Sequence, residues 1–109
     1  MIEYKDFENV DIRVGRIIEV SLLKGGKYST HKLLIDFGDE VGKKKSCARL
    51  VNYKIEELEN RLVLGVVNFP PRQIGTSISE VLTLGVPDKN GECILIAPDK
   101  TTVLGSKLF

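Results

Sequence analysis

The chain has 109 residues, of which 42% are hydrophobic and 28% charged, as in a single folded domain and unlike disordered or membrane-spanning chains. Its formal net charge is only +1, yet five basic and no acidic residues fall between positions 43 and 54. A nearly neutral chain can therefore still carry one basic face. No apolar run reaches the about 20 residues of a membrane helix, and residues 1–10 lack the pattern of a secretion signal. We therefore expect a cytoplasmic protein without membrane insertion.

Residues that bind metals or act as nucleophiles are scarce. Cys47 and Cys93 lie far apart and His31 is the only histidine, so neither a metal site nor a disulfide framework is indicated. The chain also lacks a nucleophile elbow, a Walker loop and a Cys–His pair at a suitable spacing. We expect no catalytic residues, no metal and no cofactor, which favours a binding protein over an enzyme.

Alternation of apolar and polar residues predicts strands in the first third of the chain. Residues 10–22 predict a long, half-buried strand, with Gly15 where such a strand could bend or bulge. Paired glycines predict a turn at 24–27. A second strand is expected at 33–37, followed by a hairpin loop at 38–42.

The remaining pattern adds one short helix and further strands. A third strand is expected at 44–51, a helical turn at 54–60 and an interior strand at 62–67. A loop with two prolines follows at 68–77. The last two expected strands span 78–84 and 93–97.

Three strands, a short helix and two or more strands are the order of an OB-type Greek-key barrel. We therefore predict an all-β fold with a short helix, in which five strands close and so remove their exposed edges. An SH3-like barrel is the alternative, although it usually lacks a helix at this point. Residues 1–109 are expected to form one domain, with 1–9 and 99–109 as extensions outside the barrel.

Basic residues converge where an OB barrel binds its ligands, over strands two and three and the loops beside them. The second and third expected strands contribute Lys32, Lys45 and Arg49, and the proline-stiffened loop contributes Arg72. Such a face would bind phosphates with strong salt dependence. The only aromatic residues that could stack on bases are Tyr28, Phe69 and Tyr53, which favours a structured RNA over a single strand.

In a strand, Glu80 would lie on the same face as the apolar residues Ile78 and Leu82, and its side chain would then point inward. A buried carboxylate needs a partner. We therefore interpret Glu80 as an acid that anchors a loop by hydrogen bonds, and we place Gly75 in the same structural role within the preceding loop.

Three segments in order resemble the tRNA-binding-domain family. They are residues 11–17, residues 32–38, and residues 66–75 followed by Ser79-Glu80. Within this family, the amino-acid sequence of residues 68–75 and 96–99 is similar to that of the short stand-alone members called CsaA, which are described as export chaperones. The resemblance implies a homodimer in which the terminal extensions form much of the interface.

The resemblance also implies site residues and partners. Asn68, Arg72 and Ser79 fall on family positions associated with RNA contact, and the barrel geometry adds Lys32, Lys45 and Arg49. The first expectation is a tRNA-binding protein; the alternative is a chaperone that binds unfolded preprotein peptides. A third possibility shares the RNA chemistry and pairs the domain with an aminoacyl-tRNA synthetase. Many members read Ser-Glu-Gly-Met where this chain has Ser79-Glu80-Val81-Leu82, a change shared by CsaA-like members that favours the chaperone alternative.

Overall fold

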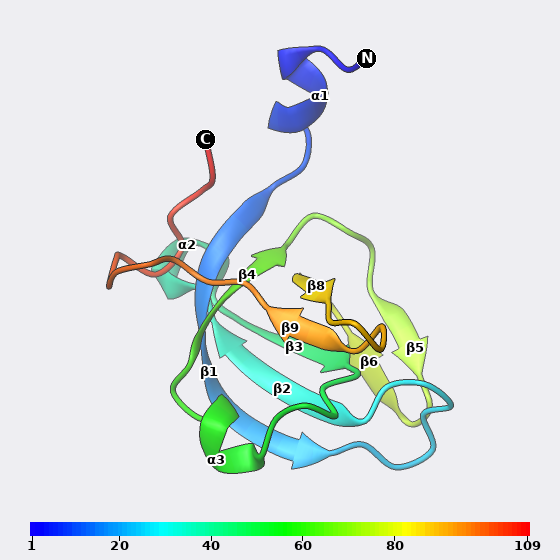
Figure 1. The fold of residues 1–109 in the computed structure, drawn as a ribbon. Coiled ribbons are helices and arrows are strands. Elements are labelled where there is room, and N and C mark those ends of the chain that lie inside the picture. Colours follow the sequence, from blue (N-terminus) through cyan, green and yellow to red (C-terminus); the bar gives the residue numbers. More distant parts are fainter.

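A five-stranded antiparallel sheet curls into a nearly closed barrel in the computed structural model, which describes residues 1–109 (Figure 1). The strand order is β3-β2-β1-β4-β7, and this confirms the predicted OB-type barrel. The bounds of these strands are β1 Ile12–Leu22, β2 His31–Asp36, β3 Lys43–Ala48, β4 Leu62–Val66 and β7 Leu82–Thr83. The predicted short helix is α3, Ile55–Leu58, between β3 and β4.

Two small hairpins and two further helices complete the chain. The hairpins pair β5 (Arg72–Ile74) with β6 (Ser77–Ser79), and β8 (Gly85–Pro87) with β9 (Cys93–Leu95). The helices are α1 (Tyr4–Glu8) and α2 (Gly38–Val41). The β5–β6 hairpin lies partly inside the expected loop 68–77, and the strand expected at 78–84 is divided between β6 and β7. Alternation of apolar and polar residues could not predict the β5–β6 hairpin. Its two short strands pair because the chain turns at Gly75, which has φ +58°.

β1 is the strand on which the sheet is built, because it pairs with β2 along one edge and with β4 along the other. The β1–β2 register shifts between Ile17 and Glu19, so the irregularity expected at Gly15 occurs a few residues later. Gly15 instead makes room for the core: a Cβ there would lie 2.8 Å from Phe37 Cε1 and 2.5 Å from Ile35 Cγ2.

The core fills the barrel with aliphatic side chains and one aromatic ring. Leu58 of α3 is fully buried, so the short helix covers the barrel with an apolar residue. Each such side chain contributes about 1.5–3 kcal/mol by leaving water. The buried core cluster consists of Ile17, Leu33, Ile35, Phe37, Leu50, Leu58, Val63, Val81 and Leu95.

Side chains help to close the barrel between β3 and the segment that joins β6 to β7. Glu80 Oε1 accepts a hydrogen bond from the Lys45 N–H (2.9 Å), and the Glu80 N–H donates to the Lys45 carbonyl (2.8 Å). Next to this pair, the Ser79 hydroxyl accepts from the Cys47 N–H (3.0 Å). These bonds satisfy backbone groups that an open sheet edge would leave unpaired.

The alternation in this segment has the opposite phase to the one expected. Ser79 and Val81 are buried, whereas Ile78 and Leu82 are exposed, so Glu80 lies at the sheet edge instead of pointing into the core. The hydrogen-bonding role expected of Glu80 does not require burial, because its acceptor bond is to the edge of β3.

The two terminal segments differ in how they meet the barrel. α1 stands away from it and buries none of its residues (Figure 1). The C-terminal tail packs along β1, where the Val14 N–H donates to the Ser106 carbonyl (3.0 Å) and the Leu108 N–H to the Ile12 carbonyl (2.9 Å). No helix in the structure has both the length and the apolar character needed to cross a bilayer.

Candidate nucleic-acid interface

The outer faces of β2 and β3 place two lysines close together. Lys32 pairs with Cys47 and Leu34 with Lys45 across the two strands, so Lys32 and Lys45 are diagonal neighbours on one face. Both lysines are exposed and border a hollow of about 520 Å³ that is shared with β1; we call it the lysine hollow. Glu19 also lines this hollow and reduces its positive charge.

A second hollow lies beside Arg72, at the edge of β3 that faces away from β2. It has a volume of about 270 Å³ and is called the Arg72 hollow below. Arg72 and Phe69 are exposed, and the Arg72 guanidinium takes part in none of the ion pairs or side-chain hydrogen bonds of the structure. This cation is therefore free to meet a ligand. The hollow is lined by Cys47, Phe69, Pro70, Arg72, Ser79, Glu80, Val81 and Leu82.

A third hollow, of about 390 Å³, extends the Arg72 hollow toward the loop between β1 and β2. The two hollows share Cys47, Arg72 and Leu82 and are therefore adjacent, and we call them together the groove. Its far wall is built from Tyr28, Arg49 and the β8–β9 hairpin, and this part is the Arg49 hollow.

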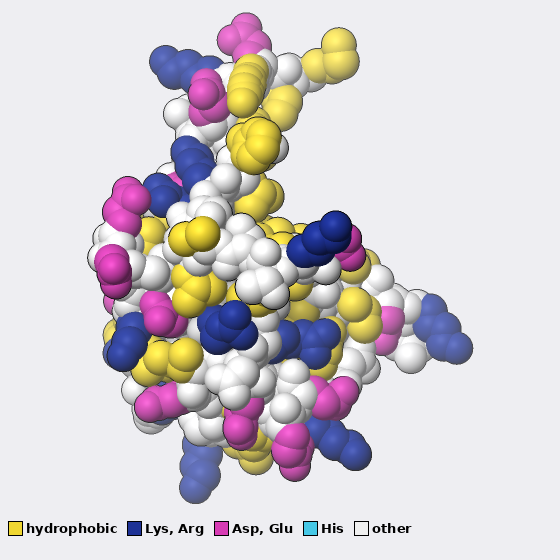
Figure 2. All heavy atoms as spheres, turned by 90° about the vertical axis from the view of Figure 1, so that its left-hand side faces the viewer, with side chains coloured by type: hydrophobic (Ala, Val, Ile, Leu, Met, Phe, Trp, Pro, Cys, Tyr) yellow, Lys and Arg dark blue, Asp and Glu magenta, His cyan; other side chains and the backbone are white.

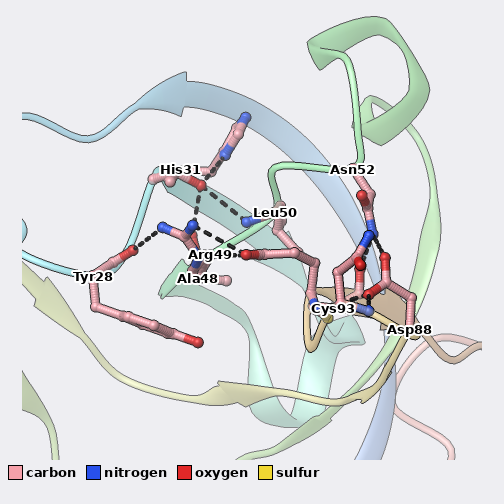
Figure 3. A network of polar contacts seen from close by, with 11 residues as sticks. Tyr28, His31, Ala48, Arg49, Leu50, Asn52, Asp88 and Cys93 are labelled. Carbon is pink, nitrogen blue, oxygen red and sulfur yellow. Dashed lines mark hydrogen bonds and ion pairs between the residues drawn. The ribbon is translucent and has the colours of Figure 1, made fainter.

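Arg49 is paired within the protein, in contrast to Arg72. Its Nε donates to Glu92 Oε2 (3.0 Å) and its Nη2 to Glu92 Oε1 (3.1 Å), which is a two-pronged ion pair. Its Nη1 donates to the Tyr28 carbonyl (3.3 Å), and the guanidinium lies 5.1 Å from the centre of the Tyr28 ring (Figure 3). The hydrogen bond to Glu92 raises the pKa of Arg49.

Asn68 and Ser79 use their polar atoms to hold the barrel together. Asn68 Oδ1 accepts from the Asp11 N–H (3.1 Å) and its Nδ2 donates to the Asn9 carbonyl (2.8 Å), so this exposed amide ties the loop after β4 to the start of β1. The Ser79 hydroxyl is buried and also donates to the Val81 carbonyl (3.3 Å). Ser79 nevertheless lines the Arg72 hollow, whereas Asn68 lies outside it.

Gly75 lies where the β5–β6 turn touches the loop between β1 and β2. A Cβ at Gly75 would lie 2.8 Å from the backbone carbonyl carbon of Gly25, in the loop between β1 and β2. Its φ of +58° is also a conformation that side chains disfavour. The contact joins the β5–β6 hairpin, which carries Arg72, to the opposite loop.

Two residues that matter for the groove were not expected from the sequence. Glu92 pairs with Arg49 across 43 positions, and no local pattern reports such a partner. Cys47 was not among the expected site residues, yet it lines both parts of the groove. Burial raises the pKa of the Cys47 thiol, and this works against an activated nucleophile.

The nearly closed barrel and its strand order place the protein among the small OB-barrel domains. The family profile described as a putative tRNA binding domain matches residues 12–107, and the chain belongs to this family.

Relatives with this domain include methionine–tRNA ligases. The chain is 33% identical to the enzyme of Archaeoglobus fulgidus over 107 residues and 36% identical to that of Pyrococcus abyssi over 113 residues. These matches cover 98% of this chain but only 16% and 14% of the two ligases, so the chain corresponds to a small part of each enzyme.

Solved structures of similar chains are of the same size. The CsaA chaperone protein of Picrophilus torridus is 48% identical, with a TM-score of 0.93 over the whole of both chains. The chaperone CsaA of Bacillus anthracis is 34% identical, with a TM-score of 0.86 over 100% of this chain and 99% of that one. A MetRS-related protein of Pyrococcus horikoshii shares the fold at 22% identity and a TM-score of 0.86.

Proposed function

We propose that this protein binds tRNA through the groove and the adjoining lysine hollow, without catalysing a reaction. The observation that carries the proposal is Arg72: an unpaired guanidinium on a short hairpin, between an apolar hollow and the outer face of β3. Membership of the putative tRNA binding domain family supports the same ligand.

The cations of this face divide into two groups in the proposal. Arg72, Lys32 and Lys45 are exposed and neutralise backbone phosphates, so each contributes about 0.7–0.9 to the slope of log K against log salt. Arg49 belongs to the wall of the groove, because Glu92 already balances its charge. Asn68 and Ser79 hold the segments that carry the face, and the exposed Asn68 amide can also meet a nearby ribose or phosphate.

The aromatic residues fit a folded RNA better than an extended single strand. Tyr28 and Phe69 are exposed at the two ends of the groove and each can receive one base. Tyr53 cannot do so, because its ring is half-buried against the core and its hydroxyl accepts a hydrogen bond from the Leu95 N–H (2.9 Å). Two separated stacking positions suit unpaired bases of a structured RNA.

Peptide binding is the second candidate, and two observations favour it. The Arg72 hollow has apolar walls formed by Phe69, Pro70 and Leu82, which could receive the side chains of an unfolded segment. The CsaA chaperone proteins match this chain along its full length. Burial of apolar side chains would make such binding far less sensitive to salt than phosphate contacts.

We also propose that the protein acts as a homodimer, with an aminoacyl-tRNA synthetase as a further partner. α1 has five residues, buries none of them and carries a stacked Tyr4–Phe7 pair, and so short a helix is marginal without packing. Figure 2 shows hydrophobic side chains on this protruding segment. A second copy that covers α1 would bury them. Analytical ultracentrifugation should show a dimer that Tyr4→Asp weakens; a monomer at all concentrations would refute this part.

The experiment that tests the main proposal is a filter-binding titration with bulk tRNA at several salt concentrations. Arg72→Ala is compared with Lys100→Ala, which removes one exposed positive charge from the C-terminal tail. We expect saturable binding that falls with salt, about tenfold weaker binding for Arg72→Ala, and a wild-type titration for Lys100→Ala.

The same titration separates the two candidate functions. Absence of tRNA binding at low salt would refute the RNA proposal. Unfolded-peptide binding that is insensitive to salt would then support the chaperone candidate. Equal losses for both variants would show a general charge effect and would refute the role given to Arg72.

A further inference from the structure

Glu92 occupies the guanidinium edge that a ligand phosphate would use. The Nε and Nη2 atoms of Arg49 form the fork that recognises phosphates and carboxylates in pairs. Both atoms donate to the two oxygens of Glu92, at 3.0 and 3.1 Å. The third nitrogen, Nη1, donates to the Tyr28 carbonyl at 3.3 Å. Arg49 therefore lies in the groove wall with its phosphate-binding edge filled.

The backbone of Glu92 is held in place by the turn of the β8–β9 hairpin. Asp88 Oδ1 accepts hydrogen bonds from the N–H groups of Glu92 (3.0 Å) and Asn90 (2.7 Å), and the Asp88 N–H donates to the Glu92 carbonyl (2.8 Å). Asp88 Oδ2 also accepts from the side chain of Asn52, at 2.9 Å (Figure 3). Glu92 thus differs from a loose surface acid, since its main chain is fixed on both sides.

The pair lies where its charge affects ligand choice. Arg49 and Glu92 both line the Arg49 hollow, whose other side includes Arg72. Their side chains are 33% and 24% exposed, so the carboxylate is partly screened from solvent but still faces the hollow. An acidic group that enters this part of the groove would meet the Glu92 charge and would find the Nε/Nη2 edge of Arg49 already occupied.

We propose that Glu92 determines the specificity of the groove by masking Arg49. This inference rests on the proposed binding of tRNA. It assigns phosphate contact to Arg72 and the lysine hollow and leaves the Arg49 side of the groove without net positive charge. A polyanion gains affinity only by reaching Arg72 and the lysine hollow together. The masking withholds one cation from other acidic ligands and so narrows the range of ligands that the groove binds.

The test compares Glu92→Gln with Glu56→Gln, a change of the same charge at an exposed position of α3 without a hydrogen bond or ion pair of its side chain. Binding of bulk tRNA is titrated at several salt concentrations, and elution from immobilised heparin is recorded as a second readout. For Glu92→Gln we expect about fivefold tighter tRNA binding and a slope against log salt steeper by about 0.7–0.9. Later elution from heparin should accompany this gain, and Glu56→Gln should match the wild type.

Arg49→Ala gives an independent measurement. Masking predicts that Arg49→Ala removes the gain of Glu92→Gln, so that the double variant, which lacks both charges of the pair, binds tRNA within about twofold of the wild type. An unchanged slope for Glu92→Gln, or an equal gain for Glu56→Gln, would overturn the proposal. So would a double variant, still folded by circular dichroism, that keeps the gain of Glu92→Gln.

The outcomes also separate this inference from the function on which it rests. If the wild type does not bind tRNA, the proposed function fails, and later heparin elution of Glu92→Gln alone would still support masking. If the wild type binds tRNA and Glu92→Gln changes neither slope nor elution, the proposed function stands and masking fails.

Discussion

The two ends of the groove carry one arginine each, and the two side chains are used differently. Arg72 extends from the β5–β6 hairpin without a partner, whereas Arg49 is held by Glu92 and Tyr28. Both were expected from the sequence to contact RNA on the basis of charge and place in the barrel. The difference shows that a cation in a groove is a candidate ligand contact only when the fold leaves its donors free.

The two ends are also held together by different forces. At the Arg72 end, two loops meet through the backbones of Gly75 and Gly25, so the contact uses no side chain. At the Arg49 end, Asp88, Asn52 and Glu92 form a network of side-chain hydrogen bonds. Substitutions at the Arg72 end should therefore act by steric overlap, whereas substitutions at the Arg49 end should act by changing charge and hydrogen bonding.

The largest expected effect concerns the glycines of the two ends. Gly75→Ala introduces a Cβ that would lie 2.8 Å from the Gly25 backbone at a φ of +58°. Strain of about 1–2 kcal/mol for the left-handed conformation and about 1–3 kcal/mol for the overlap should lower the free energy of unfolding. Gly91→Ala is the control, because its φ of +82° carries the strain while nothing lies within 4 Å of the added Cβ. Urea titrations that give equal losses for both variants would refute the loop–loop contact.

The next effect is a reversal between the two arginines. Arg72→Ala should weaken tRNA binding about tenfold and leave Tm unchanged, because the side chain has no partner to lose. Arg49→Ala should weaken binding less than Arg72→Ala does, and it should lower Tm, since it leaves Glu92 without its donor. Parallel filter-binding and thermal-unfolding experiments check both quantities. If Arg49→Ala has the larger binding defect, the assignment of roles is wrong.

A smaller effect is expected at the seam, by which we mean the hydrogen bonds between Glu80 and the backbone of β3 beside the Arg72 hollow. Glu80→Ala removes the acceptor of the Lys45 N–H and should cost about 1 kcal/mol of unfolding free energy. Glu80→Gln keeps an acceptor oxygen and should cost less. Denaturant titration measures both losses. Equal losses would indicate that the negative charge, and not the hydrogen bond, stabilises the seam.

The smallest effect is a pH dependence at the Arg49 end. Hydrogen bonds from Asn52, then from the N–H groups of Glu92 and Asn90, hold the pKa of Asp88 below its ordinary value of 3.8. A lowered folded-state pKa stabilises the protein above the ordinary value, and this stabilisation is lost as pH falls through the folded-state pKa. Asp88→Asn should therefore lower Tm by a few degrees at neutral pH, with a difference from the wild type that shrinks below pH 3.8.

Asp99→Asn, at an exposed position of the C-terminal segment, is the matched control for this series. It should follow the wild type across the whole pH range. A difference between Asp88→Asn and the wild type that stays constant down to low pH would show that the carboxylate charge of Asp88 does not stabilise the hairpin.

Local pattern predicted most of the barrel, because strand alternation and turn residues act over a few positions. The strands near β1, β2 and β3 and the short α3 were expected close to where they lie, and so was their order in an OB-type barrel. Arg72 was also found from local signals, as a basic residue in a loop that two prolines stiffen. Family resemblance in residues 11–17 and 66–75 pointed to the family that the profile then matched.

Tertiary structure alone decided which side chains of the groove are free. Contacts with the edge of β3 decided which side chains of residues 78–82 are buried. They put Ser79 inside the barrel and Glu80 at the sheet edge. The pairing of Arg49 with Glu92 depends on the β8–β9 hairpin, which forms one wall of the groove. A charged residue looks the same in sequence whether its partner is water or a carboxylate 43 positions away, because local patterns do not report contacts that only chain folding brings together.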